Sequence, residues 1–123
     1  MKILLDSRPA SQLGYSGLKP TGGQTLEVKV TGFGASQIPA NAASVLLNLT
    51  SVDPDGAGFA TVYPCGSPRP ATSNLNFQTG AISNLVSAKV GDGGRVCIYT
   101  SASTHLAADV NGYYPDGSIG VAG

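Results

Sequence analysis

Residues 45–65 read VLLNLTSVDPDGAGFATVYPC, and this stretch decides the fold class. Two runs rich in β-forming residues, 45–52 and 59–65, flank the turn sequence DPDG at 53–56. The first run is apolar almost throughout apart from Asn48, so it predicts a central strand covered on both faces. The two runs together predict a β-hairpin around which the rest of the chain is organised.

Working outward, the chain shows further β-type runs and no helical periodicity. Residues 25–31 alternate between apolar and polar side chains, which predicts a strand with one buried face. Two runs around a glycine-rich turn, 85–90 and 95–100, predict a second hairpin, and residues 105–114 would complete a three-stranded meander. We expect about eight strands in an all-β, antiparallel two-layer β-sandwich, of which the jelly roll is one form.

The composition limits both the domain count and the function classes. The 123 residues fit one domain, which we place at 1–115, with 116–123 as a flexible tail or linker. Seven basic and seven acidic residues balance and form no basic cluster, which argues against a nucleic-acid partner. No apolar run is long enough to span a membrane, so membrane insertion is not expected, and the N-terminus does not read as a signal peptide.

Catalysis is not expected from this sequence. The chain has no phosphate-binding loop, no cluster of metal ligands and no catalytic triad in a supporting context, so we expect neither a cofactor nor a metal. The two carboxylates of residues 53–56 resemble the opening of a calcium loop, but the later ligands of such a loop are missing.

Two cysteines, Cys65 and Cys97, lie at or within predicted strands. A disulfide between neighbouring strands is the favoured interpretation, and it fits a secreted or cell-surface protein. Two free buried thiols are the second interpretation. A reactive thiol is the third, and it would need a base such as His105, the one histidine of the chain.

Several polar residues interrupt apolar runs. Asp6 and Arg8 lie on the same side of a short strand, which predicts a local charge pair. Asn48 begins an N-glycosylation sequon, but in a buried strand it reads better as an amide that bonds to backbone groups. Together with Asp109, these residues predict an internal hydrogen-bonded framework.

Candidate ligand-binding residues lie in two places. Arg69 stands between two prolines and is well displayed. Asn74 and Asn76 share one face of a short strand, where their amides could bond to sugar hydroxyls, face solvent, or form an amide ladder bonded to loops. Tyr114, near the end of the last strand, could stack on a sugar ring. The other tyrosines have the same chemistry, and they are Tyr15, Tyr63, Tyr99 and Tyr113.

Long motifs resemble a known family. They are LDSRP at 5–9, IPANAASVLLNLT at 38–50, GFATVYPCG at 58–66, RPATSNLNF at 69–77 and ADVNGYY at 108–114. They resemble a β-rich accessory module of secreted actinobacterial proteins, whose pattern reads LDTR, NVT, GFVTVYPCG, SNLNF and DVxGYF. The resemblance covers residues 3–114, with mild departures at Ser7, Leu49 and Tyr114.

The resemblance implies a non-catalytic extracellular accessory module. The hydrolase domains beside which such modules occur suggest binding to carbohydrate or cell-wall polysaccharide. The alternative is a structural, adhesion or oligomerisation module without a small-molecule ligand. The low charged fraction of 11% favours this alternative, because poorly charged surfaces associate readily, and a homo-oligomer is then expected.

Overall fold

The structure is a computed structural model that describes residues 2–31 and 38–115. The tail predicted at 116–123 lies outside the described residues. Within them, eight strands and two 3₁₀ turns follow in chain order. They are β1 (Lys2–Asp6), η1 (Pro9–Ser11), β2 (Thr25–Lys29), β3 (Ser44–Val52), β4 (Gly58–Pro64), β5 (Leu75–Phe77), β6 (Ala81–Lys89), η2 (Asp92–Gly94), β7 (Arg95–Thr100) and β8 (His105–Tyr114).

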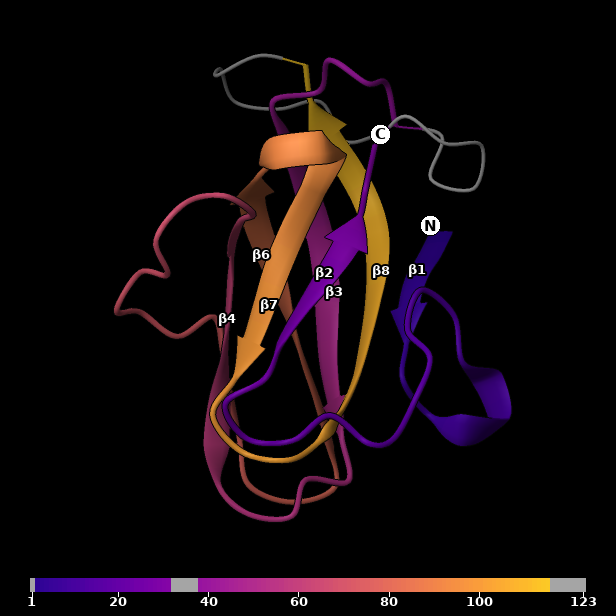
Figure 1. The fold of residues 1–123 in the computed structure, drawn as a ribbon, viewed down its shortest axis with the longest axis vertical. Helices are drawn as coiled ribbons and strands as arrows, with labels where there is room; N and C mark the ends of the chain where they lie inside the picture. The colour runs from indigo at the N-terminus through magenta and orange to yellow at the C-terminus, as the bar shows by residue number, and fades with distance from the viewer. Residues whose placement is uncertain (1, 32–37, 116–123) are drawn as a thin grey trace.

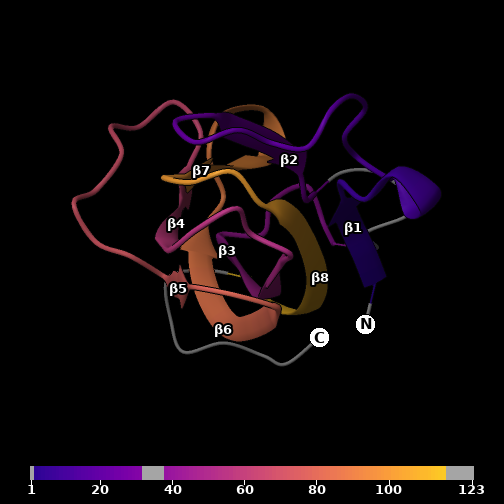
Figure 2. The same cartoon turned by 90° about the horizontal axis from the view of Figure 1, so that it is seen from below.

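The strands form two four-stranded antiparallel sheets that pack face to face (Figures 1 and 2). One sheet has the order β1-β8-β3-β6 and is called sheet A, and the other has the order β2-β7-β4-β5 and is called sheet B. Consecutive strands change sheet at every step except between β4 and β5. This strand order is that of a jelly roll, so the predicted all-β sandwich is confirmed.

Alternate side chains along the strands face inward and form the core. The burial of β3 switches at every residue between fully buried and half-buried, and that of β2 between buried and exposed. The inward residues meet between the sheets. Prominent among the fully buried ones are Val28, Val30, Val45, Leu47, Leu49, Val96, Ile98 and Leu106.

The expectation that β3 is covered on both faces is wrong. The strand is central, with β8 and β6 as its neighbours, but only the face of Val45, Leu47 and Leu49 is buried. The other face carries Asn48 and Thr50 and is half-buried. The second sheet can cover only one side of the first, so the outer face of a two-layer sandwich stays accessible.

The predicted hairpin of residues 45–65 is also wrong. The two runs form β3 and β4, which lie in opposite sheets. Each strand has its own apolar face, and these faces are buried against each other only when the strands are in different layers. The connection turns sharply at Asp53, whose φ is 55°, and Lys19 holds it by donating to the Asp53 carbonyl oxygen at 2.6 Å.

The second hairpin and the meander are wrong for the same reason. β6 and β8 belong to sheet A, whereas β7 between them belongs to sheet B. The turn η2 carries the chain from one sheet to the other, and Gly93 and Gly94 have φ angles of 69° and 73° there. This left-handed conformation explains the glycine-rich sequence, which occurs at sheet crossings as well as in hairpins.

Candidate functional site

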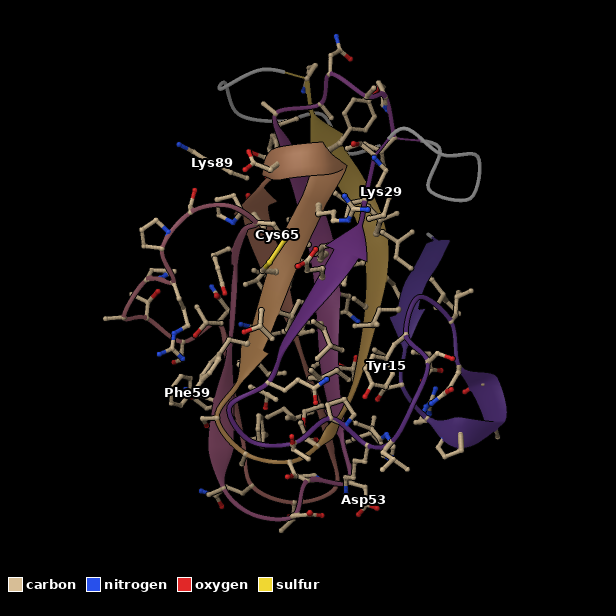
Figure 3. The ribbon with its side chains drawn as sticks, viewed as in Figure 1. Tyr15, Lys29, Asp53, Phe59, Cys65 and Lys89 are labelled. Atoms are coloured by element: carbon tan, nitrogen blue, oxygen red, sulfur yellow. A yellow bond between two sulfur atoms is a disulfide. The ribbon has the colours of Figure 1, made fainter. Side chains whose placement is uncertain are left out.

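The Cys65–Cys97 disulfide is present, with a Cα–Cα distance of 5.1 Å. Cys97 lies on the outer face of β7, opposite Tyr63 of β4, and Cys65 directly follows β4. The bridge therefore links the end of one strand of sheet B to its neighbour (Figure 3). This confirms the favoured interpretation of the two cysteines.

Beyond Cys65, residues 66–73 form a loop that projects from the sandwich before the chain enters β5 (Figures 1 and 2). The disulfide holds the first end of this loop. Thr61 holds the second end, because its hydroxyl donates to the Thr72 carbonyl oxygen at 2.7 Å. Both anchors lie on sheet B, so the loop is tied to the outside of that sheet.

Asn74 supports the loop structurally. Its side-chain oxygen accepts the Val62 N–H at 2.7 Å, and its own N–H donates to Ala60 at 2.8 Å. Because β5 pairs with β4 only through Leu75–Phe77, Val62 lies beyond the paired segment. The carboxamide of Asn74 thus replaces a missing strand partner, which is a structural role in a place that the sequence does not specify.

Arg69, near the middle of the loop, lies over Tyr99. Its Cζ is 3.6 Å from the centroid of the Tyr99 ring, which is a cation–π contact. The Phe59 ring neighbours Tyr99, with the two ring centroids 6.0 Å apart. Phe59 is 36% exposed, so an aromatic surface next to the Tyr99 ring remains open to a ligand.

Asn76 extends this surface across β5. It pairs with Phe59 in the register of β4 and β5, and its side chain is exposed. It also lines two neighbouring hollows between the edges of β5 and β6, each with a cavity volume of about 400 Å³. Ile82 of β6 lines both hollows as well. Phe59, Arg69, Asn76 and Tyr99 are called the Arg69 site from here on.

The four predicted ligand-binding residues do not come together. Arg69, Asn74 and Asn76 are all on or beside sheet B. Tyr114 ends β8 in sheet A, where it pairs with Ser44. Among the other tyrosines, Tyr15 and Tyr113 pack against the core.

The sequence reasoning missed Phe59, and it named Tyr99 only as one of five tyrosines that could stack on a sugar, without placing it beside the disulfide. A signal was available, because strand alternation places Tyr99 on the same face as Cys97, two residues earlier. A strand-to-strand disulfide on an outer face would therefore have predicted an outward tyrosine beside it.

Asp6 and Arg8 form the predicted charge pair. The Asp6 carboxylate accepts Arg8 Nη2–H at 2.8 Å and both Nε–H and the backbone N–H at 3.0 Å. The Ser11 hydroxyl donates to the same carboxylate at 2.8 Å. The hydrogen bonds from Arg8 are the main reason that the pKa of Asp6 falls from 3.8 to about 2, although burial opposes this shift.

Asn48 and Asp109 form a separate pair. They are cross-strand neighbours in β3 and β8, and both side chains are half-exposed on the outer face of sheet A. Among the described residues, no hydrogen bond joins the side chains of Asn48 and Asp109 to Asp6 or Arg8. The four residues of the predicted framework thus occupy two places.

His105 contacts Ser7 and not a cysteine. Ser7 Oγ lies 3.0 Å from His105 Nδ1 and accepts the Leu106 N–H at 3.0 Å. Ser7 is fully buried, with 0% exposure, so its hydroxyl is out of reach of a substrate in this structure. The contacts tie the chain just after β1 to β8.

Residues 2–31 and 38–115 contain no group of three or more His, Cys, Asp or Glu side chains placed to hold a metal ion. The same residues contain no helix with the length and apolar character to cross a membrane. Comparison of the chain with protein-family models, curated proteins and solved structures found no match. The function must therefore be argued from the Arg69 site itself.

Proposed function

We propose that this protein is a non-catalytic extracellular accessory module that binds carbohydrate or cell-wall polysaccharide through the Arg69 site. The observation that carries the proposal is the grouping of Phe59, Asn76 and Arg69 on one side of sheet B. A partly exposed aromatic ring can pack against the apolar face of a sugar, and amide and guanidinium groups can bond to its oxygens.

The structure around the Arg69 site supports this proposal. The site lies on sheet B, and the disulfide and Thr61 hold the neighbouring loop in place. A preorganised site loses less conformational entropy on binding than a mobile one. The hollows beside Asn76 offer space for a neighbouring sugar unit.

The disulfide also supports a secreted or cell-surface location, because such bonds persist in oxidising compartments. The motif resemblance to accessory modules of secreted actinobacterial proteins points the same way. We take both as part of the proposal.

A pull-down with insoluble polysaccharides, followed by calorimetric titration of soluble fragments, tests binding. Phe59→Ala should weaken affinity about tenfold or more, since burial of a phenylalanine side chain contributes roughly 1.5–3 kcal/mol. Leu85→Ala is the matched control, because Leu85 is an exposed apolar residue of sheet A. Absence of binding to every polysaccharide at millimolar sugar concentration would refute the proposal.

One observation favours an assembly module as the second candidate. On the outer face of sheet A, Ile3 and Leu85 are 54% and 53% exposed, and they flank the Asn48–Asp109 pair. A second copy of the chain could cover this apolar face. Light scattering over a range of concentrations tests it, and a monomer throughout would reject it.

A further inference from the structure

The charge of Arg69 has no acidic partner among the described residues. The ion pairs in this part of the chain join Arg8 to Asp6, Lys19 to Asp55 and Arg95 to Glu27. Arg69 is exposed, and its guanidinium lies over the Tyr99 ring. A guanidinium without a carboxylate partner among the described residues is therefore held on the Tyr99 ring of the Arg69 site.

The contact with Tyr99 also fixes how this guanidinium can bind. At 3.6 Å from the ring centroid, Cζ is so close that an edge-on guanidinium would drive a nitrogen into the ring. The guanidinium must therefore lie with its face toward Tyr99. Its N–H donors point outward along its edges, which is the arrangement that pairs with two oxygens of one anion.

The backbone around Arg69 limits its freedom. Pro68 and Pro70 fix their own φ angles, and Pro70 restricts Arg69 to extended conformations. The anchors at Cys65 and Thr72 hold the two sides of the loop. Part of the conformational entropy of the long arginine side chain is thus already lost in the free protein, so less is lost when a ligand binds.

We infer that the ligand of the Arg69 site is an anionic polysaccharide, whose carboxylate or phosphate group pairs with the guanidinium of Arg69 while Phe59 and Asn76 contact the sugar. This inference rests on the proposed function and makes it more specific. A neutral glycan would use the aromatic ring and the amide but would leave the arginine charge unpaired. An anionic glycan uses all three groups, and charge-assisted bidentate pairing is about twice as strong as neutral hydrogen bonding.

Calorimetric titration with matched ligands tests the inference. The ligands are oligogalacturonate, the same oligosaccharide fully methyl-esterified, and a glycerol-phosphate glycan polymer. We expect the wild-type protein to bind at least one of the two anionic ligands tenfold or more tightly than the neutral ester. Preference between carboxylate and phosphate identifies the source of the anion. The difference should shrink as salt increases, because partly exposed charges are screened.

Variants of Arg69 test whether this residue causes the preference for the anionic ligand. Arg69→Gln should reduce affinity for the anionic ligand tenfold or more while binding of the neutral ester changes less than twofold. Arg69→Lys should recover only part of the loss, because lysine lacks the planar fork. The control is Arg95→Gln, which removes another exposed arginine, on the strand that carries Tyr99, and should change affinity less than twofold.

The outcomes separate the inference from the proposed function. If anionic and neutral ligands bind equally and Phe59→Ala still lowers the affinity for both, the inference is overturned and the carbohydrate proposal stands. An Arg69→Gln protein that keeps its preference for the anion would also overturn the inference. Absence of binding to all three ligands and to neutral polysaccharides would overturn both. Circular dichroism of each variant confirms that it is folded.

Discussion

Arg69 lies 3.6 Å over the ring of Tyr99, so a loop that leaves β4 is packed on the outer face of β7. The Cys65–Cys97 disulfide joins the same loop and the same strand. A covalent and a cation–π contact thus fix the position of one loop on sheet B. This relationship places the loop residue Arg69 over the outer face of sheet B, whose strands carry the other three residues of the candidate site.

Removing the disulfide should destabilise the protein. The bridged cysteines are 32 residues apart, for which the chain-entropy model gives about 3–4 kcal/mol. We expect the double variant Cys65→Ser, Cys97→Ser to lose about this much free energy of unfolding in urea titration. A loss below about 1 kcal/mol would contradict the expected effect. A thiol assay of the denatured, non-reduced wild type should find no free thiol.

Acid should lower the free energy of unfolding, because the folded protein stabilises the charged form of Asp6. Its pKa is about 2 when folded and 3.8 ordinarily, so its stabilising effect is complete above pH 4 and is lost as the pH falls through about 2. The difference corresponds to about 2 kcal/mol at neutral pH. Asp6→Asn should lose about this much at pH 7 and flatten the dependence of stability on pH between 4 and 2.

Asp55→Asn is the control for that experiment. Asp55 also forms a salt bridge, with Lys19 at 2.8 Å, but its side chain is 66% exposed. An exposed ion pair contributes only about 0–1 kcal/mol. Equal effects of the two substitutions would show that the buried position of Asp6 does not matter.

Two consecutive leucines test the one-sided burial of β3. Leu47 has 0% exposure, whereas Leu46 lies on the half-buried outer face. Leu47→Ala should cost about 2–5 kcal/mol in chemical denaturation, because it leaves a cavity in the core. Leu46→Ala should cost about 1 kcal/mol or less. Similar losses would indicate that both faces are covered.

Substitutions of Asn74 and Asn76 should separate an effect on stability from an effect on polysaccharide binding. Asn74→Ala leaves the Val62 N–H without its side-chain partner and should cost about 1–3 kcal/mol of stability. Asn76→Ala changes an exposed side chain, so its effect on stability should stay within about 0.5 kcal/mol. It should nevertheless weaken polysaccharide binding. Thermal unfolding and titration of both variants make the comparison, and weaker binding only in Asn74→Ala would point to an indirect effect.

Part of the candidate site was accessible from the sequence. The prolines beside Arg69 showed that this cation is displayed, and the alternation of residues 74–78 showed that Asn76 is outward. The hydrogen bond from Val62 to Asn74 was not accessible, because it depends on how far β5 pairs with β4. Tyr114 had the right chemistry for stacking, but its distance from the other candidates depends on which sheet contains β8.

The sequence by itself determined the β-class, the strand positions and most inward-facing residues, because alternation of apolar and polar side chains is a local property of a strand. Only the tertiary structure decided which strands share a sheet. A run such as β4 has the same local pattern whether it pairs with β3 or crosses to the opposite layer, and burial of both apolar faces selects the crossing. That choice brings β7 beside β4 and so places Tyr99 beneath Arg69.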